Sequence, residues 1–177
     1  MNYFVLKVKN GKEADVLSRS RELFRDEDVT VFWFRRELQI RKSGAIKNVL
    51  SPLFPGYLII QASSIAPQIF RKFREIPGFS HFLKSNTNIS CLSGRDRELI
   101  LHFIRCGETI AKSMVLFTPN QPIKILSGPL KGLEGMIIKV DKRKKRIKVR
   151  LALYKDSFCI DFGFESVEAA PQTGDGK

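Results

Sequence analysis

The sequence has few cysteines and no pattern of metal ligands. Its 177 residues include three cysteines and two histidines. No two cysteines form a CxxC pair, and neither His81 nor His102 has a paired ligand. These spacings argue against a disulfide framework and against a structural zinc site. We therefore expect Cys91, Cys106 and Cys159 to be ordinary semi-buried thiols, and we expect no metal site.

Long apolar runs are also missing. The longest extend over about four residues, as in Met114–Phe117, whereas a helix that crosses a bilayer needs about 20. The first residues, Met1–Lys7, enter a strand-like pattern without the apolar segment of a signal peptide. We therefore expect a cytoplasmic protein that contacts no membrane.

The residue combinations of common enzymes are absent as well. We find no nucleophile beside a base, no phosphate-loop pattern and no metal-ligand set, so we expect no catalytic residue and no cofactor. What the chain does have is a hydrophobic fraction of 43%, with 14 Phe. That much apolar surface can offset the entropy of ordering, which excludes a disordered chain. The length fits one large domain or two small ones.

Positive charge is in excess and unevenly placed. The net charge is +13, and no Asp or Glu occurs from Leu38 to Arg74. Residues 121–155 hold 11 basic and two acidic residues, a net of +9, whereas residues 156–177 have a net of −4. The run Lys142–Arg146 places five like charges side by side, which is unfavourable unless a polyanion neutralises them. This distribution indicates phosphate binding in the C-terminal part.

The first 106 residues alternate between strand and helix patterns. Strand patterns cover 3–8, 29–40, 53–60 and 79–83, and helix patterns cover 10–24, 64–75 and 93–106. A basic loop is expected at 41–49, and the Pro55-Gly56 pair suggests a bulge or an exposed edge in the strand that contains it. The order β-α-β-β-α-β-α predicts an α+β fold, an antiparallel sheet with flanking helices.

The pattern changes after residue 106. Residues 107–121 are polar and mixed, with Pro119 and Pro122 near their end, so we expect a linker there. Residues 122–170 then alternate with a period of two, as in Ile147–Leu151, which predicts four or five short strands in a small SH3-like β-barrel. The basic run 142–146 falls at a hairpin tip between two of these strands. The tail 171–177 lacks apolar residues and is expected to be disordered.

Two sets of motifs resemble known families. Ile125–Met136, continued through Val140 and Lys148–Leu151, is similar to the KOW motif of RNA-associated proteins. Five fragments in order resemble the N-terminal (NGN-type) domain of the NusG family: Tyr3–Val5, Gly11–Glu13, Phe34–Glu37, Pro52–Tyr57 and Ile76–Gly78. The resemblance covers residues 2 to about 169. It departs at Asn120-Gln121, where many relatives have Gly with an acidic residue, and this affects only the boundary of the linker.

The resemblance implies a transcription elongation factor that is not an enzyme. Its N-terminal domain, residues 1–106, would bind the clamp helices of RNA polymerase, and the KOW domain, residues 122–170, would contact nucleic acid, Rho or a ribosomal protein. The positions that match the polymerase-binding surface of the family are Tyr3, Phe4, Phe54, Pro55, Tyr57 and Ile59. Of these we expect Phe54 and Tyr57 to be the exposed ones, because they flank the Pro-Gly pair that suggests an exposed edge.

Basic residues supply the candidates for nucleic-acid contacts. We expect an RNA-binding surface, suited to a hairpin of nascent RNA, made of Lys131, Lys142, Arg143, Lys144, Lys145, Arg146, Lys148 and Arg150. In the first domain, upstream or non-template DNA would lie near Arg19, Arg35, Arg36, Arg41 and Lys42. A flexible linker of about 13 residues would keep a weak RNA contact local to a docked monomer.

Several functions fit this sequence. The strong charge of the KOW domain favours a specialised paralogue of the RfaH and LoaP type, which promotes antitermination of specific operons. The alternatives are a housekeeping NusG that couples polymerase to Rho or the ribosome, and a KOW-containing ribosomal or RNA-processing protein. A further alternative is a C-terminal domain that switches to a helical hairpin, as in RfaH. The regular alternation of apolar and polar residues with a period of two disfavours it.

Overall fold

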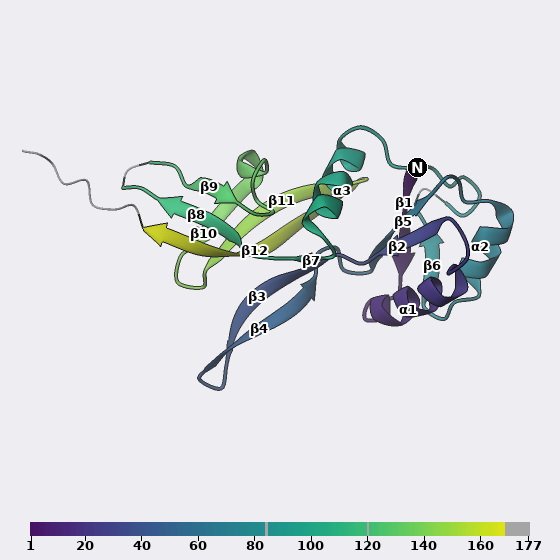
Figure 1. The fold of residues 1–177 in the computed structure, drawn as a ribbon, viewed down its shortest axis with the longest axis horizontal. Helices are drawn as coiled ribbons and strands as arrows, with labels where there is room; N and C mark the ends of the chain where they lie inside the picture. The colour runs from purple at the N-terminus through teal and green to yellow at the C-terminus, as the bar shows by residue number, and fades with distance from the viewer. Residues whose placement is uncertain (84, 120, 169–177) are drawn as a thin grey trace, which may run out of the picture.

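The computed structural model describes residues 1–83, 85–119 and 121–168, so the expected disordered tail lies outside the described residues. It contains two large sheets and a protruding hairpin (Figure 1). This agrees with the α+β class expected from the sequence, including a β-rich C-terminal part. Within the described residues, no helix is long and apolar enough to cross a membrane.

The N-terminal part is a four-stranded antiparallel sheet with the order β2-β5-β1-β6. Its strands are β1 (Asn2–Val8), β2 (Val29–Phe32), β5 (Tyr57–Ala62) and β6 (Phe79–Phe82). Helices α1 (Glu13–Leu23) and α2 (Pro67–Arg74) pack beside this sheet (Figure 1). The two central strands, β1 and β5, are buried almost throughout, which explains why they read as nearly continuous apolar runs.

The two faces of this sheet belong to different cores. Phe4, Leu6, Leu58 and Ile60 pack with apolar residues of α1 and α2, such as Phe73. The alternate residues of the same strands belong to a second core, which continues into the C-terminal part: Tyr3, Val5 and Ile59. The period of two in a strand thus decides which half of the molecule each side chain contacts.

The prediction of a loop at 41–49 is wrong. Strands β3 (Arg35–Lys42) and β4 (Ala45–Pro52) pair along their full length as a hairpin that extends away from both large sheets (Figure 1). The turn consists of Ser43 and Gly44, with φ of 51° and 78°. Two successive residues with positive φ match the right-handed twist of a hairpin, and this is why a short Ser-Gly turn suffices. The segment is polar because β4 has little buried surface, and this is why the sequence pattern indicated a loop rather than a strand.

The expected linker at 107–121 also differs from the structure. Helix α3 (Gly94–Cys106) ends at Gly107 as predicted, but strands β7 (Thr109–Ile110) and β8 (Ser113–Phe117) follow at once. β7 pairs with β3 and β8 pairs with β12, so this segment is not an extended tether. The division into domains at 106 and 121 stays a prediction.

The C-terminal part is a five-stranded sheet with the order β10-β11-β12-β8-β9. Besides β8 it contains β9 (Lys124–Ser127), β10 (Ile137–Asp141), β11 (Arg146–Leu153) and β12 (Asp156–Glu168), with a short 3₁₀ helix, η1 (Glu134–Met136), before β10. The basic run lies at the tip between β10 and β11, as expected. These described residues form strands rather than the helical hairpin of the fold-switching alternative.

Candidate functional site

The predicted polymerase-facing residues do not form an exposed patch. Phe54 is 3% exposed and Tyr57 is half-buried, so the expectation that both are exposed is wrong. The Pro55-Gly56 pair precedes β5, which is a central strand rather than an edge. Of the six positions, only Pro55 is exposed, and Phe4 faces the α1 and α2 core on the opposite side of the sheet.

Phe54 and Tyr57 pack against aromatic rings from later parts of the chain. We call Phe54, Tyr57, Phe103 and Phe158 the aromatic junction, because Phe103 comes from α3 and Phe158 from β12, so the set joins the N-terminal and C-terminal parts. The Phe158 ring lies edge-on to the rings of Phe54 and Tyr57, with centroid distances of 5.2 and 5.7 Å. Phe103 lies 6.1 Å from Phe54 and stacks at 6.2 Å on Phe162 of the C-terminal sheet. The C-terminal part therefore covers Phe54 and one side of Tyr57.

A hydrogen bond at the aromatic junction also joins β5 to β12. The Tyr57 hydroxyl donates to Oδ2 of Asp156 at 2.5 Å. Burial, with the hydrogen bond to Asp156 and its charge, raises the pKa of Tyr57 to about 12. The phenol therefore stays protonated, and remains a donor to Asp156, well above neutral pH.

The turn that presents Pro55 and Tyr57 is held by a buried acid. Glu13, at the start of α1, is 4% exposed, and its Oε1 accepts a hydrogen bond from the Gly56 N–H at 2.8 Å. Gly56 has a φ of 77°, and a Cβ there would lie 2.2 Å from Asn10 Oδ1. Both the Gly-Lys-Glu and the Pro-Gly-Tyr fragments thus shape the same turn.

Glu13→Ala is expected to lower the free energy of unfolding by about 1–3 kcal/mol, because the buried Gly56 N–H loses its acceptor. Urea denaturation followed by circular dichroism measures this. Glu13→Gln keeps an acceptor and should cost less, and Glu22→Ala, at an exposed position of the same helix, is the control. Equal losses for Glu13→Ala and Glu22→Ala would contradict the role of Glu13.

The basic tip, Lys142–Arg146, projects from the C-terminal sheet. Its first four residues are exposed, and Arg146 is half-buried. The Asp141 carboxylate accepts a hydrogen bond from the Lys144 N–H at 2.9 Å, and Lys145 has a φ of 51°. The ammonium of Lys142 lies 4.3 Å from the ring centroid of Phe117. A hydrogen bond to the backbone therefore stabilises the turn, and its cationic side chains remain accessible to solvent.

Arg146 and Lys148 face inward from the tip. Arg146 Nη2 donates to the Gln39 carbonyl oxygen of β3 at 2.9 Å. Arg146 Nη1 and Lys148 Nζ approach the two carboxylate oxygens of Asp161 at 3.9 and 3.6 Å. Nearby, burial lowers the pKa of Arg36, while the charge of Asp161 opposes this shift and that of Arg146 adds to it. The sequence drew attention to the cations and missed Asp161, which lies in the acidic region 156–177.

The remaining RNA candidates are not all near the tip. Lys148 and Arg150 lie on the face of β11 opposite the buried Ile147, Val149 and Leu151, as predicted. Lys131 lies elsewhere, because its neighbour Leu130 bonds to Ser113 at the start of β8, whereas Lys142 contacts Phe117 at the end of β8. The structure thus separates Lys131 from the basic tip by the length of β8.

The DNA candidates are also dispersed. Arg41 and Lys42 are exposed at the end of the β3–β4 hairpin, and Arg19 is exposed on α1. Arg35 lies at the base of that hairpin with its guanidinium 5.0 Å from the Trp33 ring. Arg36 donates to the Pro52 carbonyl oxygen. Only Arg41 and Lys42 therefore form a common exposed site.

Comparison with known proteins shows the family to which this chain belongs. The family described as "Transcription termination factor nusG" matches residues 1–101, more than half of the chain. This chain belongs to the NusG family. It is accordingly a NusG-like transcription termination/antitermination factor.

Individual NusG relatives are distant but match most of the chain. The transcription termination/antitermination protein NusG of Buchnera aphidicola is 26% identical over 172 residues, which cover 94% of both chains. NusG of Xylella fastidiosa is 23% identical over 136 residues, 72% of this chain and 74% of its own. A solved structure of Thermotoga maritima NusG superposes with a TM-score of 0.54 at 18% identity, covering 92% and 93% of the two chains, which supports the fold.

The NusG family consists of transcription factors rather than enzymes. In the part of the chain that the structure describes, no group of three or more His, Cys, Asp or Glu side chains could hold a metal ion. The two features of the described residues that bear on binding are the aromatic junction, which the C-terminal sheet covers, and the basic tip.

Proposed function

We propose that this NusG family member is an elongation factor that docks on RNA polymerase through its N-terminal part and binds nascent RNA through its basic tip. In this proposal it is a specialised antiterminator of the RfaH and LoaP type, acting as a monomer on specific operons. The basic tip carries the proposal, because four adjacent exposed cations on an ordered turn are suited to RNA phosphates.

Docking on polymerase would use the surface around the aromatic junction. Tyr3, Phe54, Pro55, Tyr57 and Ile59 all belong to or border the sheet face that packs toward the C-terminal part. A groove for the clamp helices needs apolar and aromatic lining, which these residues supply. Because Phe158 covers Phe54 and Tyr57, docking requires the C-terminal sheet to move off this face. Arg41 and Lys42, at the end of the β3–β4 hairpin, are the best-placed candidates for non-template DNA.

Neutralising the basic tip tests the RNA contact. In the tip variant, Lys142, Arg143, Lys144 and Lys145 are replaced by Ser or Gln, and Arg146 is kept because it bonds to Gln39. Binding of a fluorescent leader-RNA hairpin should weaken about 10- to 100-fold at moderate salt, and the slope of log Kd against log salt should fall by about 2–3. Fluorescence anisotropy at several salt concentrations measures both.

The matched control replaces four exposed cations outside the tip: Lys9, Arg25, Arg95 and Arg105. It makes the same change in net charge and should reduce RNA affinity much less. Unchanged binding by the tip variant would refute the RNA contact. Tight binding to Rho with no preference for RNA would favour a housekeeping NusG, and co-sedimentation with ribosomal subunits without polymerase affinity would favour a ribosomal role. Transcription in vitro through terminators beside its own gene tests antitermination directly.

A further inference from the structure

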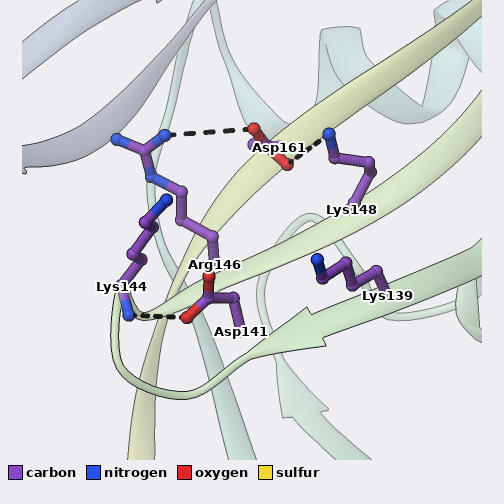
Figure 2. Close-up of a pocket in the computed structure, with 6 residues that line it drawn as sticks. All are labelled: Lys139, Asp141, Lys144, Arg146, Lys148 and Asp161. Atoms are coloured by element: carbon purple, nitrogen blue, oxygen red, sulfur yellow. Dashed lines mark hydrogen bonds and ion pairs between the residues drawn. The ribbon is translucent and has the colours of Figure 1, made fainter.

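We propose that a pocket behind the basic tip is a binding site for a single phosphate group, and that Asp161 occupies the place of this phosphate in the unbound protein. The pocket, which we call the tip pocket, is lined by Lys139, Asp141, Lys144, Arg146, Lys148 and Asp161 (Figure 2). The inference rests on the proposed RNA contact and deepens it, because it distinguishes one internal site from the exposed cations around it.

The tip pocket has the size and charge that a phosphate needs. Its volume is about 120 Å³, and strands β10, β11 and β12 all contribute to its lining. Four of the six lining side chains are cationic and two are carboxylates. Arg and Lys cations converging from several strands provide hydrogen-bond donors from different directions, which suits the oxygens of one phosphate.

One of the two carboxylates already has a role in the turn. Asp141 Oδ1 accepts the Lys144 N–H bond that shapes the basic tip. Lys139 and Lys144 form no ion pair with any residue that the structure describes. These two cations are therefore available to an anion that enters from solvent.

Asp161 is held loosely by the other two cations. Figure 2 shows Arg146 and Lys148 approaching its carboxylate from opposite sides, at 3.9 and 3.6 Å. Charge-assisted hydrogen bonds between such groups are normally 2.7–2.9 Å long, so neither contact is a full hydrogen bond. A phosphate group has more acceptor oxygens than a carboxylate, so it offers acceptors to the other cations that line the tip pocket as well.

Arg146 also has an unused donor. Its Nε is buried and finds no hydrogen-bond partner among the described residues. Buried donors of this kind are rare because each one costs desolvation free energy. The same side chain lines the tip pocket, so a bound phosphate is a natural acceptor for its guanidinium.

Asp161 therefore acts as an internal competitor of the phosphate. Its side chain is 29% exposed, which leaves it room to turn toward solvent when an anion enters. Removing its charge should favour RNA, whereas removal of a remote acid should have only the weak effect of net charge.

The test compares Asp161→Asn with Glu165→Gln in the full chain. Glu165 lies on the same strand, forms one ion pair with Lys112 at 3.4 Å and does not line the tip pocket. Asp161→Asn should bind the leader-RNA hairpin about three- to tenfold more tightly, because the two partly exposed ion pairs no longer compete. Glu165→Gln should change the affinity less than twofold. Equal gains for the two variants, or weaker binding by Asp161→Asn, would overturn the proposal.

A double-mutant cycle guards against an indirect effect on folding. In a Lys148→Gln background, the gain from Asp161→Asn should shrink, because one of the cations that Asp161 occupies is gone. A gain of the same size would overturn the competitor role. Thermal melts of all variants identify any that fold poorly.

Inorganic phosphate distinguishes the source of the anion. At constant ionic strength, displacement of RNA by phosphate beyond that by chloride supports a site that also takes free phosphate. No such displacement, with the Asp161→Asn gain intact, supports a site for phosphates of the RNA chain. RNA binding by the tip variant that is as tight as that by the wild type would instead refute the proposed function, so the two failures are distinguishable.

Discussion

Replacing Phe103 with alanine is expected to lower the free energy of unfolding by about 3–5 kcal/mol, the largest effect of any single substitution considered for this chain. Phe103 is fully buried. Its ring lies 6.1 Å from Phe34, 6.1 Å from Phe54 and 6.2 Å from Phe162. These neighbours come from the N-terminal part and the C-terminal sheet, so the cavity would open where both parts meet.

Chemical denaturation of the full chain measures this loss. Leu101→Ala is the control, because Leu101 lies on the same helix and is only half-buried. Its substitution should cost clearly less. A loss below about 1 kcal/mol for Phe103→Ala would mean that the surroundings collapse around the site or that the ring is not packed between the two parts.

Replacing Phe158 with alanine is expected to strengthen binding to RNA polymerase by about tenfold. Phe158 is half-buried and makes edge-on contacts with Phe54 and Tyr57. Two aromatic pairs contribute about 0.5–1.5 kcal/mol each, and about 1.4 kcal/mol corresponds to a factor of ten. If the covered form dominates, the docking-competent population rises by the same factor, and so does the apparent affinity.

Biolayer interferometry with immobilised core polymerase measures this gain. Phe117→Ala is the matched control, because Phe117 is also half-buried on the C-terminal sheet but packs on Phe164 rather than on the aromatic junction. It should leave polymerase affinity unchanged. An unchanged or lower affinity for Phe158→Ala would contradict the proposal that this surface docks on polymerase.

The difference between prediction and structure is largest where burial depends on distant residues. Pro55-Gly56 suggested an exposed edge, yet Tyr57 begins a central strand and bonds to Asp156, 99 residues later. No local pattern around Tyr57 contains that information. The β3–β4 hairpin was missed because most of β4 is exposed, and an exposed strand shows little alternation of apolar and polar residues. Only Ser43-Gly44 marked the turn.

The sequence by itself determined the α+β class, the strand alternation of Ile147–Leu151, the position of the basic tip and, through its motifs, the NusG resemblance. These depend on local periodicity, turn residues and charge, all of which are properties of neighbouring residues. Only the tertiary structure decided that Phe158 covers Phe54 and that Asp161 lies between Arg146 and Lys148. Such contacts join strands far apart in the chain, and their formation depends on how whole sheets pack rather than on any one segment.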